Sequence, residues 1–153
     1  MALPDENFYS HCALLRLFQR AVKVHIVWIT RYRKPVLFGD VAVRLRDLIR
    51  EICLSMDIDI LKGHVSKDRV HLFVSLPPQI SVSKLVGRIK GKTSRKLLAE
   101  NRRLSGQFWG RHLWGRGYFA ASSGNVTDDV IMQYIAEQDL EERAHDDDFT
   151  LAP

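Results

Sequence analysis

The chain has 153 residues, of which 46% are hydrophobic and 27% are charged, and its formal net charge at pH 7 is +5. This length allows one domain with its own core but not two of ordinary size, and the composition excludes a disordered or fibrous chain. No stretch reaches the roughly 18 uninterrupted apolar residues of a membrane span, and the polar first seven residues do not resemble a signal peptide. We therefore expect a cytoplasmic protein with no membrane partner. Cys12 and Cys53 lack CxxC spacing and are expected to be buried free thiols rather than parts of a disulfide or a zinc site.

The charges are unevenly distributed along the chain. Residues 84–116 hold ten lysines and arginines against one acid, a net charge of +9, whereas residues 126–153 hold nine acids against one arginine, a net charge of −8. A basic segment can be a solvated helix face, but basic charge clustered in this way is more typical of a protein that binds a polyanion. Nucleic acid is therefore the first expected partner.

The first half of the chain predicts one strand, one helix and a hairpin. Residues 21–30 are β-branched and aromatic with partial alternation, which indicates a strand. From residue 40 to about residue 54, apolar residues recur with helical spacing and predict an amphipathic helix. Two short apolar runs, 58–65 and 70–76, are separated by turn residues and predict two strands joined in a hairpin.

The second half predicts a basic helix, an aromatic segment and a last helix. Ser81 is placed to cap a helix over residues 82–99 that is apolar on one side and basic on the other. Residues 107–123 are rich in aromatics and glycine and suggest two extended pieces with a kink. Thr127 and the two acids after it predict a third helix to about residue 143.

The predicted order is β-α-β-β-α-β followed by a helix. This order is that of the ferredoxin-like split α+β fold, an antiparallel sheet with helices on one face. We predict an N-terminal extension over residues 1–20, a single domain over 21–143, and an acidic, disordered tail over 144–153.

Two pairs of residues have a spacing that suits chemistry. Arg69 and His71 are two apart on a predicted strand and project from one face, which is an arrangement suited to two ligands of one ion. Tyr134 and Gln138 are four apart on a predicted helix and are neighbours on its surface. Taken singly, a strand histidine is more often structural, and a tyrosine on an apolar helix is more often core.

Several short motifs occur together and in one order. They are VHIVW at 24–28 with RYR at 31–33, KDRVH at 67–71, LPP at 76–78, IKGKTS at 89–94, FW at 108–109 with GRGYF at 115–119, and YI at 134–135 with Gln138. This set resembles the single-tyrosine HUH transposases, the TnpA-type enzymes of small bacterial insertion sequences and their REP-associated relatives, over residues 22–140.

The resemblance implies an activity and a set of roles. The family motif on the strand is Asp-His-hydrophobic-His, whose histidines bind Mg²⁺ or Mn²⁺ together with a glutamine four residues after a nucleophilic tyrosine. It therefore implies that Tyr134 is the nucleophile and that His71 and Gln138 are metal ligands, with Arg69 at the position of the first histidine. The implied reaction cleaves and rejoins single-stranded DNA at element ends through a 5′-phosphotyrosine. The implied substrate carries DNA hairpins, and the enzyme is implied to be a homodimer in which the tyrosine helix serves its own or the partner's metal site.

Arg69 leaves three hypotheses open, because a guanidinium stays protonated and offers no lone pair to a metal. The first is an inactive relative that still binds hairpins. In the second, Arg69 itself contacts the scissile phosphate. In the third, His64 replaces the missing ligand, which requires Val65 to pair with Val70 so that His64 lies opposite His71 on one face.

Other polar and aromatic residues have less specific roles. His25 either supports the site or is packed, and His112 is expected to contact DNA or a partner. The basic residues expected to contact phosphates are Lys84, Arg88, Lys90, Lys92, Arg95, Lys96, Arg111 and Arg116. The aromatics that could stack on unpaired bases, although some must be core, are Trp109, Trp114, Tyr118 and Phe119. An RNA-binding module on the same topology is a weaker alternative, since the third strand carries only Phe73 as an aromatic.

Overall fold

A five-stranded antiparallel sheet forms the centre of the molecule. The computed structural model describes residues 21–108, 110, 112–122, 130–131, 133–135, 137 and 148–151. The elements are β1 (Val22–Ile29), η1 (Arg31–Arg33), α2 (Gly39–Ser55), β2 (Asp59–Val65), β3 (Arg69–Leu76), α3 (Val82–Glu100), α4 (Arg102–Ser105), β4 (Phe119–Ser122) and β5 (Asp148–Leu151).

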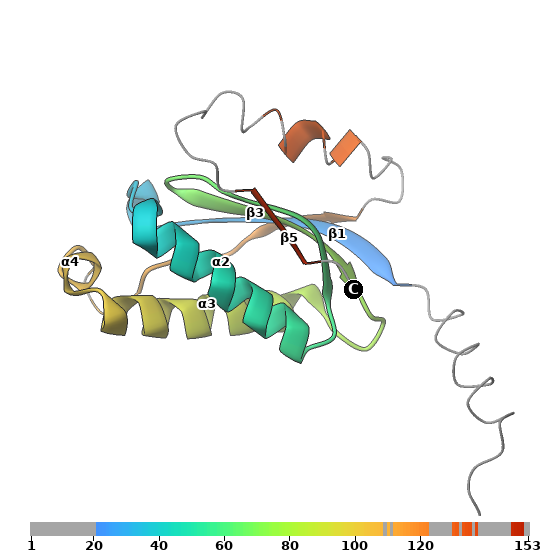
Figure 1. The fold of residues 1–153 in the computed structure, drawn as a ribbon. Helices are drawn as coiled ribbons and strands as arrows, with labels where there is room; N and C mark the ends of the chain where they lie inside the picture. The colour runs from blue at the N-terminus through green and yellow to red at the C-terminus, as the bar shows by residue number, and fades with distance from the viewer. Residues whose placement is uncertain are drawn as a thin grey trace, which may run out of the picture.

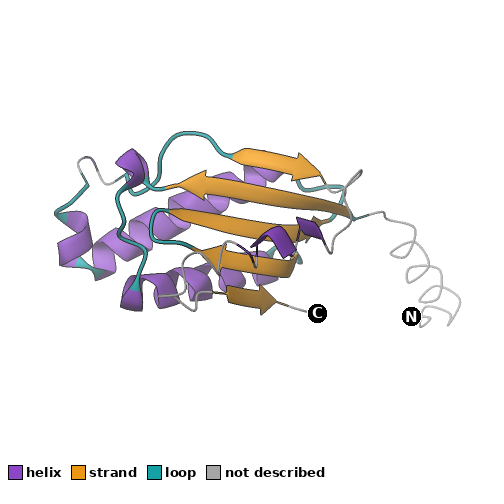
Figure 2. Cartoon of the chain, turned by 90° about the horizontal axis from the view of Figure 1, so that it is seen from above, coloured by secondary structure: helices purple, strands orange, loops and turns teal. Residues whose placement is uncertain are grey.

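The strand order is β4-β1-β3-β2-β5, and each neighbouring pair is antiparallel (Figure 2). The first four strands with α2 and α3 form the β-α-β-β-α-β arrangement, so the predicted ferredoxin-like split fold is confirmed. β1 and β3 are the two central strands of this unit, and six of the eight residues of β3 are buried.

α2 and α3 both pack on one face of the sheet (Figure 1). The predicted helical periodicities are confirmed, since Leu45, Leu48 and Ile52 of α2 are buried in the same cluster as Leu85 and Ile89 of α3. Alternate residues of β1 and β3 meet these helices because successive side chains of a strand point to opposite faces. The main apolar core therefore lies between the sheet and the two helices.

The other face of the sheet carries the helical residues 130–137, as far as they are described (Figure 1). Ile131 and Ile135 are buried there against Phe73 of β3, with Leu61 partly buried beside them. This small cluster is separate from the main core. It attaches the predicted tyrosine helix to the sheet.

Local signals explain how α3 begins and ends. The Ser81 hydroxyl accepts a hydrogen bond from the Lys84 amide at 3.1 Å, which confirms the predicted cap. Asn101 closes α3 and its side chain then caps the short α4 by accepting from the Leu104 amide at 3.0 Å. α4 lies just before the aromatic segment and was not predicted, because four residues are too few to show a helical period.

Two expectations for the C-terminal third need correction. The stretch predicted to be a loose tail contains β5, which pairs with β2 through Ile60, Gly63 and His64. The outer edge of β2 exposes backbone donors and acceptors, and a segment containing phenylalanine and threonine can pair with it. Among the described residues of the aromatic segment, the first extended piece is reduced to a single bridge between Thr30 and Trp114, and β4 is the one regular strand.

Several other predictions have a plain outcome. Cys53 is a buried free thiol, as predicted, and burial raises its pKa to about 12. Cys12, with the rest of residues 1–20, lies outside the described residues. Within the part of the chain that the structure describes, no helix is both long and apolar enough to cross a membrane.

Candidate active site

Two histidines face each other on the open face of the central strands. His25 of β1 pairs with Phe73 and His71 of β3 pairs with Val27, so the two histidines are diagonal neighbours on one face. His25 Nε2 lies 3.3 Å from His71 Nδ1, and the ring centroids are 5.5 Å apart with planes 19° from parallel. Both side chains are buried. His25 therefore belongs to the site, a role that the sequence had left open.

A third histidine lies on the other side of His71. Val65 pairs with Val70 and His64 pairs with His71, so the register that the His64 hypothesis required is present. The ring centroids of His64 and His71 are 6.3 Å apart, and His64 is fully buried. His71 thus lies between one histidine on each neighbouring strand.

Tyr134 lies over this histidine row. Its ring centroid is 6.2 Å from that of His25 and 6.4 Å from that of His71, with interplanar angles of 73° and 66°. Its side chain is 48% exposed, so the alternative that Tyr134 is a core residue is wrong. The buried Ile131 and Ile135 on the same segment hold it in place. The tyrosine of this chain therefore meets the histidines of the same chain and remains open to a substrate.

Arg69 begins β3 two residues before His71, and both side chains belong to the open face of the sheet. Its Nε lies 3.3 Å from Asp68 Oδ1, while Asp68 Oδ2 lies 3.5 Å from Nε of Arg33. Asp68 thus joins two arginines at the end of the sheet where β3 begins. The Arg69 side chain is 31% exposed, so its charge lies at the border between the histidines and solvent.

Burial keeps the paired histidines neutral. Burial lowers the pKa of His71 to about 4, and nearby His25, His64 and Arg69 contribute smaller decreases. Burial also lowers the pKa of His25. At pH 7 both rings are therefore neutral, and each has one N–H. In the His25–His71 hydrogen bond, one ring donates its N–H and the other accepts with its unprotonated nitrogen.

The donor atoms fit only part of a metal site. His71 Nε2 is buried and has no hydrogen-bond partner among the described residues. When His71 Nδ1 donates to His25 Nε2, His71 Nε2 keeps the lone pair that a metal requires. Arg69 offers no lone pair, and Gln138 lies outside the described residues. Within the described part of the chain, no three His, Cys, Asp or Glu side chains are grouped so that they could hold a metal ion.

The predicted basic surface is only partly open. Lys84, Arg88 and Arg95 of α3 are exposed, whereas Lys90 donates to the carbonyls of Gly115 and Gly117 at 2.7 and 2.8 Å. Burial lowers the pKa of Lys90. Lys90 therefore holds the loop after Trp114 against α3. Lys92 and Lys96 are partly exposed and Arg116 is exposed, while Arg111 lies outside the described residues.

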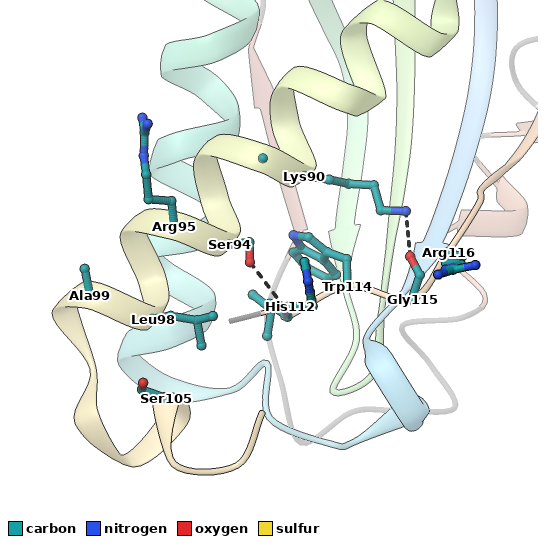
Figure 3. A pocket seen from close by; sticks show the side chains of 12 residues that line it. Lys90, Ser94, Arg95, Leu98, Ala99, Ser105, His112, Trp114, Gly115 and Arg116 are labelled. Atoms are coloured by element: carbon teal, nitrogen blue, oxygen red, sulfur yellow. Dashed lines mark hydrogen bonds between the residues drawn. The ribbon is translucent and has the colours of Figure 1, made fainter. Parts of the chain in front are cut away.

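A cavity of about 640 Å³ lies between α3 and residues 112–116 (Figure 3). Lys90, Arg95, His112 and Arg116 are the basic residues of its lining. Trp114 forms part of its wall, but its indole N–H donates to Thr93 Oγ1 at 2.9 Å and its ring packs edge-on against Trp28. The residue is buried, so Trp114 is a core residue and not a stacking surface.

The other candidate aromatics differ in exposure. Tyr118 and Phe119 are both exposed, and the Tyr118 hydroxyl lies 2.7 Å from Ser83 Oγ of α3. Trp109 lies outside the described residues. The apolar cluster of Phe73, Ile131 and Ile135 under Tyr134 has no distinctive signal in the sequence, because each residue has the pattern of an ordinary core position.

The sequence is similar to those of known transposases. Residues 18–138 match the model of the family described as "Transposase IS200 like". The chain is 31% identical over 117 residues to the ISDra2 transposase TnpA of Deinococcus radiodurans, covering 76% of this chain and 84% of that protein. It is 32% identical over 120 residues to the transposase for insertion sequence element IS200 of Salmonella typhimurium, covering 78% of each chain.

Two solved structures have a similar fold. A crystal structure of a protein from Deinococcus radiodurans R1 that is assigned as a transposase superimposes with a TM-score of 0.64 at 30% identity, covering 77% of this chain and 91% of that one. A REP-associated tyrosine transposase bound to a REP hairpin superimposes with a TM-score of 0.60 at 16% identity, covering 82% and 70%. At that identity, the second likeness shows the fold alone.

Proposed function

Because this chain belongs to the IS200-like transposase family, an enzyme family, we propose that it cleaves and rejoins single-stranded DNA with Tyr134 as the nucleophile. The observation that carries the proposal is the position of the Tyr134 ring, 6.2 and 6.4 Å from two buried histidines of the same chain and still half exposed. A tyrosine needed only for packing would not be exposed over a row of polar side chains.

The proposed chemistry uses the phenol oxygen of Tyr134. It attacks the scissile phosphorus and forms a P–O bond to the 5′ side of the DNA, while the bond to the 3′ oxygen breaks. The phenol loses its proton, and the 3′ oxygen leaves as a hydroxyl after gaining one. The phosphotyrosine keeps the bond energy, so a second 3′-hydroxyl can reverse the reaction and rejoin the strands. The transfer requires no nucleotide cofactor.

Arg69 is positioned to contact the substrate phosphate in this scheme. A guanidinium makes strong, paired hydrogen bonds to phosphate oxygens. Arg69 lies two residues from His71 on the same face and is partly exposed. Its charge would offset the charge that develops during attack, a task that the family resemblance assigns to a metal ion.

We further propose that the chain binds Mg²⁺ or Mn²⁺ only weakly. His71 and Gln138 would hold the ion, and His64 is the available substitute ligand because it lies beside His71. When bound, such an ion polarises the phosphate and orients it. The positive charge of Arg69 opposes the binding of a cation, and for this reason affinity should be low.

For the substrate we propose a DNA hairpin with a flanking single strand, bound by a homodimer. The exposed cations of α3 and the cationic lining of the adjacent cavity suit phosphate contacts. The REP-associated transposase that shares this fold is bound to a REP hairpin. DNA affinity should then fall steeply with ionic strength, whereas a flat salt dependence would mean that the basic segment is merely solvated.

A second candidate function is hairpin binding without cleavage. Arg69 favours it, because a guanidinium stands where the family resemblance places a metal-binding histidine. In that case the fold and the basic surface are kept while the chemistry is lost. The two candidates differ in whether a covalent complex forms.

A covalent-adduct assay separates the candidates. The protein is incubated with single-stranded DNA carrying candidate insertion-element ends, with Mg²⁺, Mn²⁺ or EDTA, and adducts are resolved on a denaturing gel. Active wild-type protein forms an adduct that Tyr134→Phe abolishes. An adduct that persists in EDTA supports the direct contact of Arg69 with phosphate. An adduct that is lost in His64→Ala supports His64 as a metal ligand, provided that the exposed control Leu54→Ala keeps it.

The reversion Arg69→His gives the opposing result. If wild-type protein binds the DNA but forms no adduct, while Arg69→His forms one with Mn²⁺, then the chain is a binding protein whose chemistry Arg69 has removed. That pair of results rejects the cleavage proposal. Equal thermal stability of the two proteins is the control for folding.

A further inference from the structure

The turn after β1 holds a tyrosine in an unusual backbone conformation. Tyr32 has φ 61° and ψ 17°, and Arg33 has φ 51°. This left-handed region favours glycine and asparagine over other residues. The Tyr32 side chain is 72% exposed, the largest value among the large hydrophobic side chains of the described residues.

The conformation of this turn is maintained by its backbone and by Thr30. The Thr30 amide donates to the Asp68 carbonyl at 2.9 Å, and the Arg31 amide donates to the Leu113 carbonyl at 2.8 Å. The Thr30 hydroxyl lies 2.9 Å from the Lys34 carbonyl across the turn. The Tyr32 ring takes part in none of these bonds. The fold therefore explains the shape of the turn but not the choice of an aromatic residue at its tip.

One guanidinium group lies against the Tyr32 ring, and Asp68 links two further arginines close by in the chain and the sheet. The Arg31 guanidinium carbon lies 5.1 Å from the centroid of the Tyr32 ring, in a cation–π arrangement. Arg33 pairs with Asp68, which also pairs with Arg69. Arginines beside an exposed aromatic match the chemistry of a nucleic-acid strand, which offers phosphates and flat bases in alternation.

The turn also lies beside the candidate active site. η1 follows the end of β1 next to the start of β3 (Figure 2), and the Thr30 amide is bonded to the residue that precedes Arg69. His71 is two residues further along β3, or about 7 Å at strand spacing. A strand that presents its phosphate to Tyr134 and Arg69 can therefore continue over Tyr32.

We propose that Tyr32 is a stacking platform for an unpaired base of single-stranded DNA, next to the phosphate on which Tyr134 acts, with Arg31 and Arg33 contacting the adjoining phosphates. The position relative to the scissile phosphate rests on the proposed function. The stacking itself does not, since it requires only that the chain binds single-stranded DNA. Stacking of this kind is tolerant of sequence, because every base has an aromatic face.

The test measures binding without cleavage. The full chain is titrated into a short oligothymidylate carrying one 2-aminopurine, whose fluorescence falls when it stacks on an aromatic ring. Tyr32→Asn removes the ring and suits the left-handed backbone, whereas Tyr32→Phe keeps the ring. We expect Tyr32→Asn to weaken binding about tenfold and to restore the fluorescence, and Tyr32→Phe to stay within about twofold of wild type. Leu54→Asn, a change at another exposed apolar residue, is the matched control.

Thermal unfolding of each variant separates binding from folding. Tyr32→Asn should unfold at the wild-type temperature or above it, because it relieves backbone strain and removes no buried contact. Equal binding by Tyr32→Asn and wild type would overturn the proposal. The proposal would also be overturned if Tyr32→Phe lost as much affinity for the single strand as Tyr32→Asn. It would likewise be overturned if Tyr32→Asn lost as much affinity for duplex DNA as for the single strand, since a duplex offers no unpaired base. Tighter binding of oligouridylate than of oligothymidylate would assign the ring to RNA and overturn the DNA proposal.

Failure of the proposed function gives a different pattern. If no adduct forms under any condition while Tyr32→Asn still loses affinity for the single strand, then cleavage is rejected and the stacking platform stands. If adducts form but Tyr32→Asn changes neither fluorescence nor affinity, then cleavage stands and the platform is rejected.

Discussion

The two faces of the sheet are built for different tasks. The face under α2 and α3 is covered by one large apolar cluster to which β1, β2 and β3 all contribute. On the opposite face, the buried apolar cluster of the described residues consists of Phe73, Ile131 and Ile135 with Leu61 beside them, next to three histidines and Arg69. The first face supplies most of the hydrophobic free energy of folding. The second holds Tyr134 with few apolar contacts, so changes there should alter the site more than the fold.

The largest expected effect is on the helical face. Leu72 points into the main core from the strand that also carries His71, and it is fully buried. Leu72→Ala should lower the free energy of unfolding by about 3 to 4 kcal/mol through lost burial and a residual cavity. Urea denaturation measures this loss. Single-stranded DNA affinity of the folded protein should stay at the wild-type value, and a loss below about 1 kcal/mol would contradict the assignment of this face as the main source of stability.

The second effect is a pH dependence that comes from the opposite face. The pKa of His71 is lowered from 6.5 to about 4 by burial first and then by its charged and histidine neighbours. A lowered folded-state pKa means that the unfolded chain binds more protons, so stability is full above pH 6.5 and is lost as the pH falls toward 4. The expected loss over this range is about 2 to 3 kcal/mol.

Urea denaturation in EDTA between pH 7 and pH 4 checks this dependence. His71→Asn should flatten the curve, since its side chain does not titrate. The matched control is His112→Asn, at an exposed histidine beside the cavity of Figure 3, which should keep the wild-type slope. Equal slopes in wild type and His71→Asn would show that the histidine is not held neutral by the fold.

Much of the helical face could be predicted from the sequence, because its signals are local. The helical spacing of Leu45, Leu48 and Ile52 and the cap at Ser81 each lie within one element. The hairpin is also local, since only three residues separate its strands. The pairing of Val65 with Val70, which places His64 opposite His71, could therefore be stated as a condition from the sequence.

The open face could be predicted only in part, because its contacts join distant segments. The 3.3 Å contact joins His25 and His71, which are 46 residues apart in the chain, and it depends on the register of β1 with β3. The exposure of Tyr134 depends on which side of its helix meets Phe73, and Trp114 is core because its indole reaches Thr93 of α3. The pairing of β5 with β2 likewise has no local signal.

The third prediction tests how the tyrosine is held. Ile135 is fully buried in the small cluster and adjoins Tyr134 in sequence. Ile135→Ala should cost only about 1 to 2 kcal/mol in urea denaturation, below the usual range for a buried isoleucine, because the segment can move away without opening the main core. Amide exchange within residues 130–137 should increase at least tenfold relative to β1 and β3, which is the local counterpart of that loss.

Val130→Ala is the matched control for this change. Val130 is on the same segment but is exposed, so its truncation should alter neither the unfolding free energy nor the exchange. If Ile135→Ala instead raised exchange evenly across β1, β3 and residues 130–137, the small cluster would be part of the global folding unit and the two faces would not be separable.

The smallest expected effect is on the helical face, at the cap of α3. Its expected loss of unfolding free energy is similar in size to that of Ile135→Ala, so the two variants can be compared directly. Ser81→Ala removes the bond that caps α3 and should cost about 1 kcal/mol, whereas Ser81→Asp restores an acceptor and should stay close to wild type. Because α3 packs on the main core, this loss should appear in global unfolding and leave exchange within residues 130–137 unchanged relative to β1 and β3. Ser81→Ala and Ile135→Ala, with similar losses of unfolding free energy, would then separate a change in the fold from a change in the site. Equal amide exchange within residues 130–137 in both variants would refute the division between the faces.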